Sequence, residues 1–204
     1  MSRFGPDPHA FFDHVYAIGA PWEIGGVQPA MAELVERFAP RGPALDLGCA
    51  SGDLSIHLAR QGVAVIGVDF VRAAIEEAEA KRPSLPAEVA DLLTFAVADA
   101  TRPSELGTFG SVFDSGFLHL LDADESASLI EDLGRALVRG GRLYLHEFGV
   151  EFPVDNVPRA ITETEVRERF TAAAGWRVLH IAEAEFLSTV AAPTPAIIAC
   201  IEKG

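Results

Sequence analysis

Acidic residues recur at the ends of short apolar segments, in a pattern that suits the binding of a nucleotide-like cofactor. A glycine-rich turn, Gly48–Gly52, follows the first of these segments, and Asp69 lies 21 residues after Gly48. An acid about 20 residues beyond such a turn is typical of sites that bind ribose hydroxyls. Asp99 and Asp114 end two later apolar segments. Each aspartate alone could equally cap a helix or close a turn, but the ordered series predicts a common binding crevice.

Strands and helices alternate along the first 150 residues and would bring these acids to one edge of a sheet. Apolar runs predict strands at residues 44–47, 63–68, 95–98, 112–113 and 142–147. Helices are predicted at residues 31–38, 53–60, 71–81 and 122–139, the last with a capping box at Asp122 and Glu125. Such alternation is typical of a parallel sheet with helices on both faces. Ligands bind these sheets beyond the carboxyl ends of the strands.

The remaining segments complete a single predicted domain. Residues 1–28 show no clear period, residues 162–174 look helical, and residues 176–186 and 196–201 predict two strands with no helix between them. We therefore expect an α/β fold with a Rossmann-like, seven-stranded, mostly parallel sheet, helices on both faces and an antiparallel strand pair at the C-terminal edge. The domain, 1–204, would comprise an N-terminal helical lid segment (1–40), a cofactor-binding core (41–150), and a C-terminal part with the last helix and strands (151–204).

Charge and composition disfavour several classes of partner. The 204 residues include 16 Lys and Arg against 30 Asp and Glu, a net charge of −14, whereas nucleic acids are normally bound by a basic face. No apolar run approaches the ~18 residues of a membrane helix, and no signal peptide is readable. The two cysteines and the spacing of the histidines predict no metal site. We expect a cytoplasmic protein, monomeric or homodimeric, without nucleic-acid, membrane or metal partners.

Five segments together resemble the motifs of class I S-adenosylmethionine-dependent methyltransferases. They are Leu45–Gly52, Val65–Phe70, Ala98–Ala100, Phe113–His119 and Leu137–Leu143. Within that class the chain is most similar to small bacterial methyltransferases related to the thiopurine and tellurite-resistance type, because of Pro21–Gly25 and Gly175–Val178. The resemblance implies S-adenosylmethionine as the cofactor, S-adenosylhomocysteine as the product and a small-molecule methyl acceptor.

The resemblance also implies which residues hold the methionine end of the cofactor. Gly48, Cys49 and Ala50 would line it through their backbone, and Asp114 and Ser115 would lie beside it, where the ammonium group needs an acceptor. The family usually has glycine at the position of Ala50. A methyl group there would crowd the amino-acid portion of the cofactor, so we expect some loss of affinity.

For the nucleoside end, the resemblance implies a second set of contacts. Asp69 would accept hydrogen bonds from both ribose hydroxyls, and Phe70 would lie against the adenine. Asp99 would accept from the adenine amino group, with the backbone N–H of Ala100 facing a ring nitrogen. Trp22 would close over the cofactor from the N-terminal segment, although it could equally be a core or lid aromatic residue.

His119, which follows the fourth strand, is the candidate catalytic residue. It could accept a proton from the methyl acceptor, or it could be a loop histidine that bonds the backbone. Glu147, at the end of the fifth strand, is a second candidate on the acceptor side. Aromatic residues in the segments Phe4–Trp22 and Phe148–Arg159 predict a small, partly apolar acceptor.

Two other functions stay open at this point. A non-catalytic S-adenosylmethionine-binding protein would fit the alanine in the glycine-rich turn and the lack of a clear base. A nicotinamide-dependent oxidoreductase would share the fold, but its turn has the spacing Gly-x-Gly-x-x-Gly, which this chain lacks.

Overall fold

Seven strands form one sheet in the order β3-β2-β1-β4-β5-β7-β6 in the computed structural model, which describes residues 4–153 and 157–204. The strands are β1 (Ala44–Leu47), β2 (Val65–Asp69), β3 (Leu93–Val97), β4 (Phe109–Ser115), β5 (Leu137–Phe148), β6 (Trp176–Phe186) and β7 (Thr194–Lys203). The first five run parallel, and β7 lies antiparallel between β5 and β6. The predicted fold class, with its antiparallel edge pair, is confirmed.

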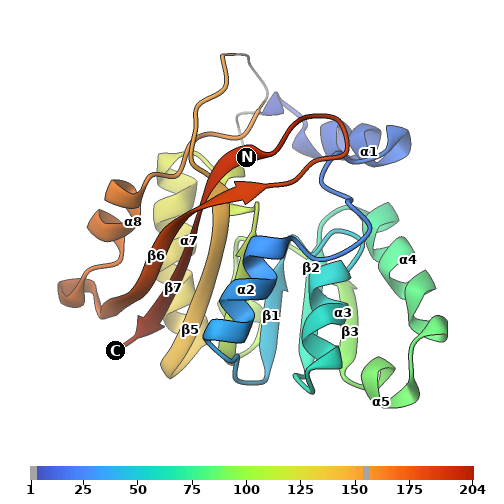
Figure 1. Cartoon of the computed structure of the whole chain (residues 1–204), viewed down its shortest axis with the longest axis horizontal. Coiled ribbons are helices and arrows are strands. Elements are labelled where there is room, and N and C mark those ends of the chain that lie inside the picture. Colours follow the sequence, from blue (N-terminus) through green and yellow to red (C-terminus); the bar gives the residue numbers. More distant parts are fainter. Residues whose placement is uncertain (1–3, 154–156) are drawn as a thin grey trace.

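Helices cover both faces of this sheet (Figure 1). They are α1 (Pro8–Ile18), α2 (Pro29–Arg37), α3 (Asp53–Arg60), α4 (Arg72–Lys81), α5 (Ala87–Ala90), α6 (Pro103–Leu106), α7 (Ala123–Ala136) and α8 (Glu163–Arg169). Apolar residues of α2, α3 and α4 pack in one core cluster, and those of α7 and α8 pack in another on the opposite face. No helix in the described ranges is long and apolar enough to cross a membrane.

The carboxyl ends of the central strands meet at one edge, as parallel pairing requires. Leu47, the last residue of β1, pairs with Val68 of β2 on one side and with Asp114 of β4 on the other. All four residues of β1 are buried, as expected of a strand covered on both faces. The segments that leave these strands therefore start side by side, and α1 lies over the same end of the sheet (Figure 1).

The ends of two predicted helices differ from the structure. The capping box of α7 is confirmed, with the Asp122 side chain bonded to backbone N–H groups, but the helix ends at Ala136 and not at residue 139. Leu137 is already extended and begins β5, which continues through Gly140 with a shift in its pairing to β4. The segment predicted as one helix at 162–174 divides into α8 and a 3-10 turn at Ala172–Ala174.

The N-terminal helix α1 was not expected from periodicity. It begins with Asp7, whose side chain accepts a hydrogen bond from the Ala10 backbone at 3.0 Å, followed by Pro8 at the first helical position. Both are ordinary helix-start signals. The aromatic residues that follow do not form a long apolar stripe with helical spacing, because they pack in a small cluster over α4.

Candidate active site

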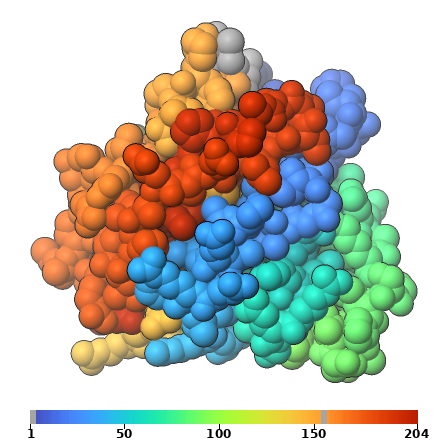
Figure 2. Space-filling view, viewed as in Figure 1, coloured from blue at the N-terminus to red at the C-terminus, as the bar shows by residue number. Residues whose placement is uncertain are grey.

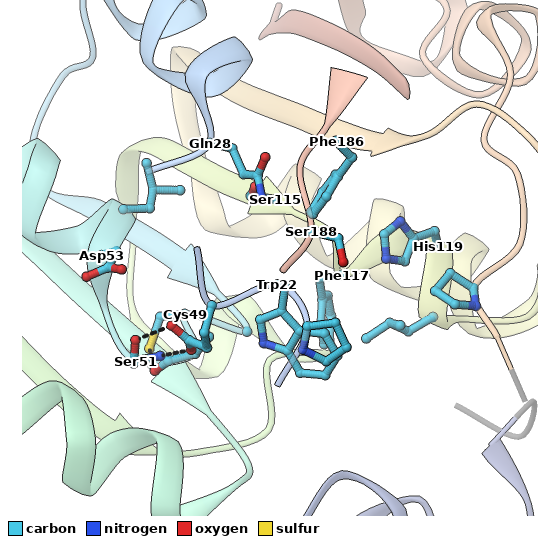
Figure 3. A pocket seen from close by; sticks show the side chains of 18 of the residues that line it. Trp22, Gln28, Cys49, Ser51, Asp53, Ser115, Phe117, His119, Phe186 and Ser188 are labelled. Atoms are coloured by element: carbon cyan, nitrogen blue, oxygen red, sulfur yellow. Dashed lines mark hydrogen bonds between the residues drawn. The ribbon is translucent and has the colours of Figure 1, made fainter. Parts of the chain in front are cut away.

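A cavity of about 420 Å³ opens beyond the carboxyl ends of β1, β2 and β4. This size is typical of a site for a small molecule or cofactor. Figure 3 shows that Cys49 and Ser51 lie at one end of it, His119 and Phe186 at the other, and Trp22 between them. The cavity brings together nine of the residues predicted from sequence: Trp22, Gly48, Cys49, Ala50, Asp69, Phe70, Ala100, Ser115 and His119.

The turn after β1 is held in shape by Asp69 at the end of β2. The backbone N–H of Ala50 donates to Asp69 Oδ2 at 3.2 Å, and that of Val71 donates to Oδ1 at 2.8 Å. Burial raises the pKa of Asp69 above its ordinary value. Each carboxylate oxygen can accept a second hydrogen bond, and the side chain lines the cavity. Asp69 can therefore hold the turn and bind two ligand hydroxyls together.

Ala50 adopts a backbone conformation that usually requires glycine. Its φ is +51°, in the left-handed region, as are Gly48 on one side (+59°) and Gly52 on the other (+82°). A β-carbon costs about 1–2 kcal/mol in this conformation. The turn thus contains a strained alanine at the position where the family usually has glycine.

Glu23 fastens the N-terminal segment to this turn, and the sequence did not predict it. Its carboxylate accepts hydrogen bonds from both the backbone N–H, at 3.0 Å, and the hydroxyl of Ser51. The Lys81 ammonium donates to the same hydroxyl at 2.6 Å and to Asp53 at 2.7 Å. Glu23 belongs to no spacing pattern with other polar residues, so the sequence alone does not indicate a role for it.

Aromatic side chains of α1 and the loop after it close the cavity above Phe70. The Phe12 ring meets Phe70 edge-on with centroids 5.6 Å apart, and His9 approaches the same ring at 4.5 Å. The indole N–H of Trp22 donates to the hydroxyl of Tyr16 at 3.2 Å. Burial raises the pKa of that hydroxyl, so it stays neutral. The role of this segment as a lid stays a prediction.

The loop between β6 and β7 completes the cover, and nothing in the sequence pointed to it. The backbone N–H of Thr189 donates to the Pro21 carbonyl at 2.9 Å. The Gln28 side chain exchanges two hydrogen bonds with the Leu187 backbone, at 2.9 and 3.0 Å. Figure 2 shows this loop, in red, packed against the blue N-terminal part of the chain. Residues more than 150 positions apart in sequence thus form one lid.

Two predicted cofactor residues do not line the cavity. Asp99 is exposed and accepts hydrogen bonds from the backbone and the hydroxyl of Thr101, at 2.8 and 2.7 Å, which is a turn-closing role. Asp114 is fully buried, and its Oδ1 accepts from the backbone N–H of Phe117 and of Leu118, at 2.9 and 3.2 Å. Their predicted contacts with the cofactor stay predictions.

His119 lies at the far end of the cavity, against an aromatic wall. Its ring stacks on Phe148 with centroids 4.7 Å apart and planes 9° from parallel, and Phe148 in turn contacts Phe152 and Phe186. Burial lowers the pKa of His119 to about 3, so the ring is neutral near pH 7. Its Nδ1 lies 2.8 Å from Glu147 Oε2.

The predicted acceptor wall is present in part. Phe12, Tyr16 and Trp22 line the cavity from the N-terminal side, and Phe148 and Phe152 from the segment that follows β5. Phe4 lies in the aromatic cluster over α4 and does not line the cavity, and residues 154–156 of the predicted wall are outside the described residues. Within the described ranges, no three His, Cys, Asp or Glu side chains are arranged to hold a metal ion.

These features define a class of protein: an α/β domain that binds a nucleoside cofactor across the carboxyl ends of its strands. A family model described as a methyltransferase domain matches residues 45–143. The 2-heptyl-1-hydroxyquinolin-4(1H)-one methyltransferase of Mycobacteroides abscessus is 29% identical over 155 residues, which are 72% of this chain and 65% of that protein. Probable thiol methyltransferase 2 of Arabidopsis thaliana is 25% identical, over 81% of this chain and 72% of that protein.

Solved structures give the same result at the level of the fold. A protein from a study of the conversion of a disulfide bond into a thioacetal group during echinomycin biosynthesis superposes with a TM-score of 0.77 at 26% identity, over 96% of this chain and 92% of that one. The glycopeptide N-methyltransferase MtfA, complexed with S-adenosylmethionine, superposes with a TM-score of 0.65 at 20% identity, over 84% and 92%. The chain therefore resembles S-adenosylmethionine-dependent methyltransferases in sequence and in fold, and residues 45–143 match a methyltransferase domain.

The charge of the cavity wall suits S-adenosylmethionine. Glu23, Asp46, Asp53 and Asp69 line it, and no Lys or Arg of the described residues does. An acidic wall attracts cations and repels anions. S-adenosylmethionine carries a sulfonium and an ammonium group, whereas a nicotinamide dinucleotide carries a diphosphate. The wall therefore fits the first cofactor and disfavours the second.

Proposed function

We propose that the protein methylates a small, flat and largely apolar acceptor whose nucleophile carries an ionisable proton, such as an aromatic hydroxyl or a thiol. One observation carries the proposal. One continuous cavity runs from the strand ends that would hold the cofactor to a chamber lined by Phe148, Phe152 and Phe186. This chamber also contains His119, whose ring is neutral. An acceptor in that chamber would lie between the cofactor and a base.

In this proposal the residues of the chain position the reactants and handle one proton. Asp69 and the turn at Gly48–Ser51 hold the cofactor, which supplies a methyl group on a positively charged sulfur. Phe148 and Phe152 orient a flat acceptor. The proton of the acceptor passes to His119 as the nucleophile attacks the methyl carbon, and the electron pair of the broken carbon–sulfur bond stays on sulfur. Alignment of this kind can supply up to ~7–11 kcal/mol of the rate enhancement.

The relatives support this choice of acceptor. Two of them are named as methyltransferases of a hydroxyquinolone and of thiols. A hydroxyquinolone is flat and aromatic and has an acidic hydroxyl, which matches the chamber around His119. A thiol also carries an ionisable proton, so both chemistries belong in the acceptor screen.

Cofactor binding is tested first, by thermal shift with S-adenosylmethionine, S-adenosylhomocysteine and NAD. A ligand at about 100 times its Kd stabilises by ~2.7 kcal/mol, or roughly 5–10 °C for a chain of this length. We expect this rise with the two sulfur compounds and none with NAD. Asp69→Ala abolishes it, and Asp91→Ala, an exposed aspartate at the end of α5, keeps it. An undiminished shift in Asp69→Ala would show that the ribose is placed wrongly.

Turnover is tested next, by following S-adenosylhomocysteine with phenols, hydroxyquinolines, thiols and amines as acceptors. We expect product with flat aromatic hydroxyl compounds or thiols, and loss of that activity in His119→Asn. Cofactor binding without turnover on any acceptor class would favour a non-catalytic binding protein. The cytoplasmic location, the monomeric or homodimeric state and the lack of nucleic-acid partners stay predictions, and light scattering measures the second.

A further inference from the structure

Two buried carboxyl groups stand behind His119 and do not reach the cavity. Asp114 and Glu147 have no exposed surface, and each shifts the pKa of the other's carboxyl group. Asp114 Oδ2 and Glu147 Oε1 have no well-formed hydrogen bond among the described residues. Two carboxylate charges buried side by side repel each other, so at least one of the pair holds a proton. The pair then carries at most one negative charge.

The surroundings place the proton on Asp114 and the charge on Glu147. Burial and the neighbouring Glu147 raise the pKa of Asp114 well above its ordinary value. Burial also raises the pKa of Glu147, to about 7, but hydrogen bonds from Asp114 and from the backbone of His119 and Leu118, together with the Arg159 cation, oppose that rise. Glu147 is thus the better-supported anion.

The charged oxygen of Glu147 meets the ring of His119. Oε2 lies 2.8 Å from Nδ1 and accepts from the His119 backbone N–H at 3.2 Å. The Phe148 backbone N–H also approaches Nδ1, at 3.3 Å, which would suit a ring without a proton there. The contact with Glu147 is shorter and involves a charge, and charge-assisted hydrogen bonds are about twice as strong as neutral ones. Nδ1 therefore carries the proton, and Nε2 has a free lone pair.

We propose that Glu147 is a positioning residue, which holds His119 as the Nδ1–H tautomer so that Nε2 accepts the proton of the methyl acceptor, while Asp114 keeps the buried pair at one negative charge. The catalytic consequence rests on the proposed function, whereas the tautomer does not. When Nε2 takes a proton, the charge on Glu147 stabilises the imidazolium ring. Burial lowers the pKa of His119, and a negative charge beside the ring opposes that effect.

The charged and titratable groups around His119 agree with this arrangement. The Arg159 guanidinium, from the segment before α8, disfavours a protonated ring. The Arg159 guanidinium is itself held by Glu165 at 2.8 Å. His146, the neighbour of Glu147 on β5, is neutral because burial lowers its pKa to about 4. Glu147 is thus the one carboxylate in direct contact with the ring among the described residues.

Glu147→Gln tests the positioning role, because it keeps the shape and removes the charge. With a phenol that is protonated at the assay pH, we expect kcat to fall at least about tenfold, which is part of the ~10²–10⁴-fold that general acid–base catalysis contributes. The fall in kcat should be smaller for phenols of lower pKa, because these are already ionised at the assay pH and need no base. The Kd for S-adenosylhomocysteine is unchanged. Glu183→Gln, the same change at an exposed position of β6, has no effect. An equal loss across the whole phenol series would overturn the proposal.

A second measurement needs no acceptor and no cofactor. Nitrogen-15 NMR of the histidine rings reports which nitrogen carries the proton, and His119→Asn identifies the signals of His119. We expect Nδ1–H in the wild type and in Asp114→Asn, whose amide still donates to Glu147, and a mixture of tautomers in Glu147→Gln. An Nε2–H ring in the wild type would overturn the proposal. An Nδ1–H ring in a protein that methylates no acceptor would leave the positioning intact and refute the proposed function instead.

Discussion

Ala50→Gly should stabilise the protein, although the same change destabilises most positions. The left-handed φ of +51° costs alanine about 1–2 kcal/mol, and glycine adopts it freely. Glycine also gives the unfolded chain more freedom, which costs about 0.4–1 kcal/mol of stability. The difference is a net gain of about 1 kcal/mol, or roughly 2–4 °C in Tm for a chain of this length.

Ala64→Gly is the matched control. Ala64 is exposed just before β2 and is not among the described residues with positive φ, so it lacks the strain that glycine would relieve. We expect this variant to lose about 0.4–1 kcal/mol. Urea unfolding followed by circular dichroism compares the two variants with the wild type. Equal losses in both would refute the assignment of strain to Ala50. Titration with S-adenosylhomocysteine in the same samples separates crowding of the cofactor from strain in the free protein.

Two further changes probe the packing around the site. Gly52→Ala should lower the free energy of unfolding by about 2–5 kcal/mol, because the new β-carbon would lie 2.7 Å from Phe95 Cζ and the backbone is left-handed. The control is Gly62→Ala, which has a φ of +80° but open space around it. In urea unfolding it should lose only about 1–2 kcal/mol. His146→Gln tests the pH dependence of stability. Burial lowers the pKa of His146 to about 4, so the folded wild type binds fewer protons than the unfolded chain between about pH 6.5 and pH 4. The wild type should therefore lose stability relative to the variant as the pH falls through this range. The difference reaches ~3 kcal/mol, and parallel unfolding curves at pH 7 and pH 4.5 would expose a wrong sign.

The sheet could be predicted from sequence because its signals are local and repeated. Each parallel strand is a short apolar run followed by a turn and a helix, and β1 is buried on both faces as such a run implies. The end of α7 was harder to place, because Gly140 and Gly141 read as a stop for the helix. In the structure those glycines lie inside β5, where the pairing to β4 shifts.

The lid could be predicted only in part, because its contacts join distant segments. Aromatic residues marked the N-terminal side, but Glu23 and the Gln28–Leu187 pair follow no spacing. Their partners are set by tertiary packing, which brings the β6–β7 loop onto the N-terminal segment. Composition can indicate that a segment covers the site, whereas the side chains that fasten this segment are set by the folded chain.

The aspartates at the strand ends show that a position at the end of a strand does not fix the environment of a side chain. Asp69, Asp99 and Asp114 all follow apolar strands, and each was predicted to contact a different part of the cofactor. Their environments differ: Asp69 lines the cavity and holds the turn, Asp99 is exposed and closes a turn, and Asp114 is buried against Glu147. A carboxyl group that faces a cavity can contact a ligand, whereas one buried beside a second carboxyl group takes up a proton. The same residue type at the end of a strand can thus line a cavity, close a turn or lie buried beside a second carboxyl group.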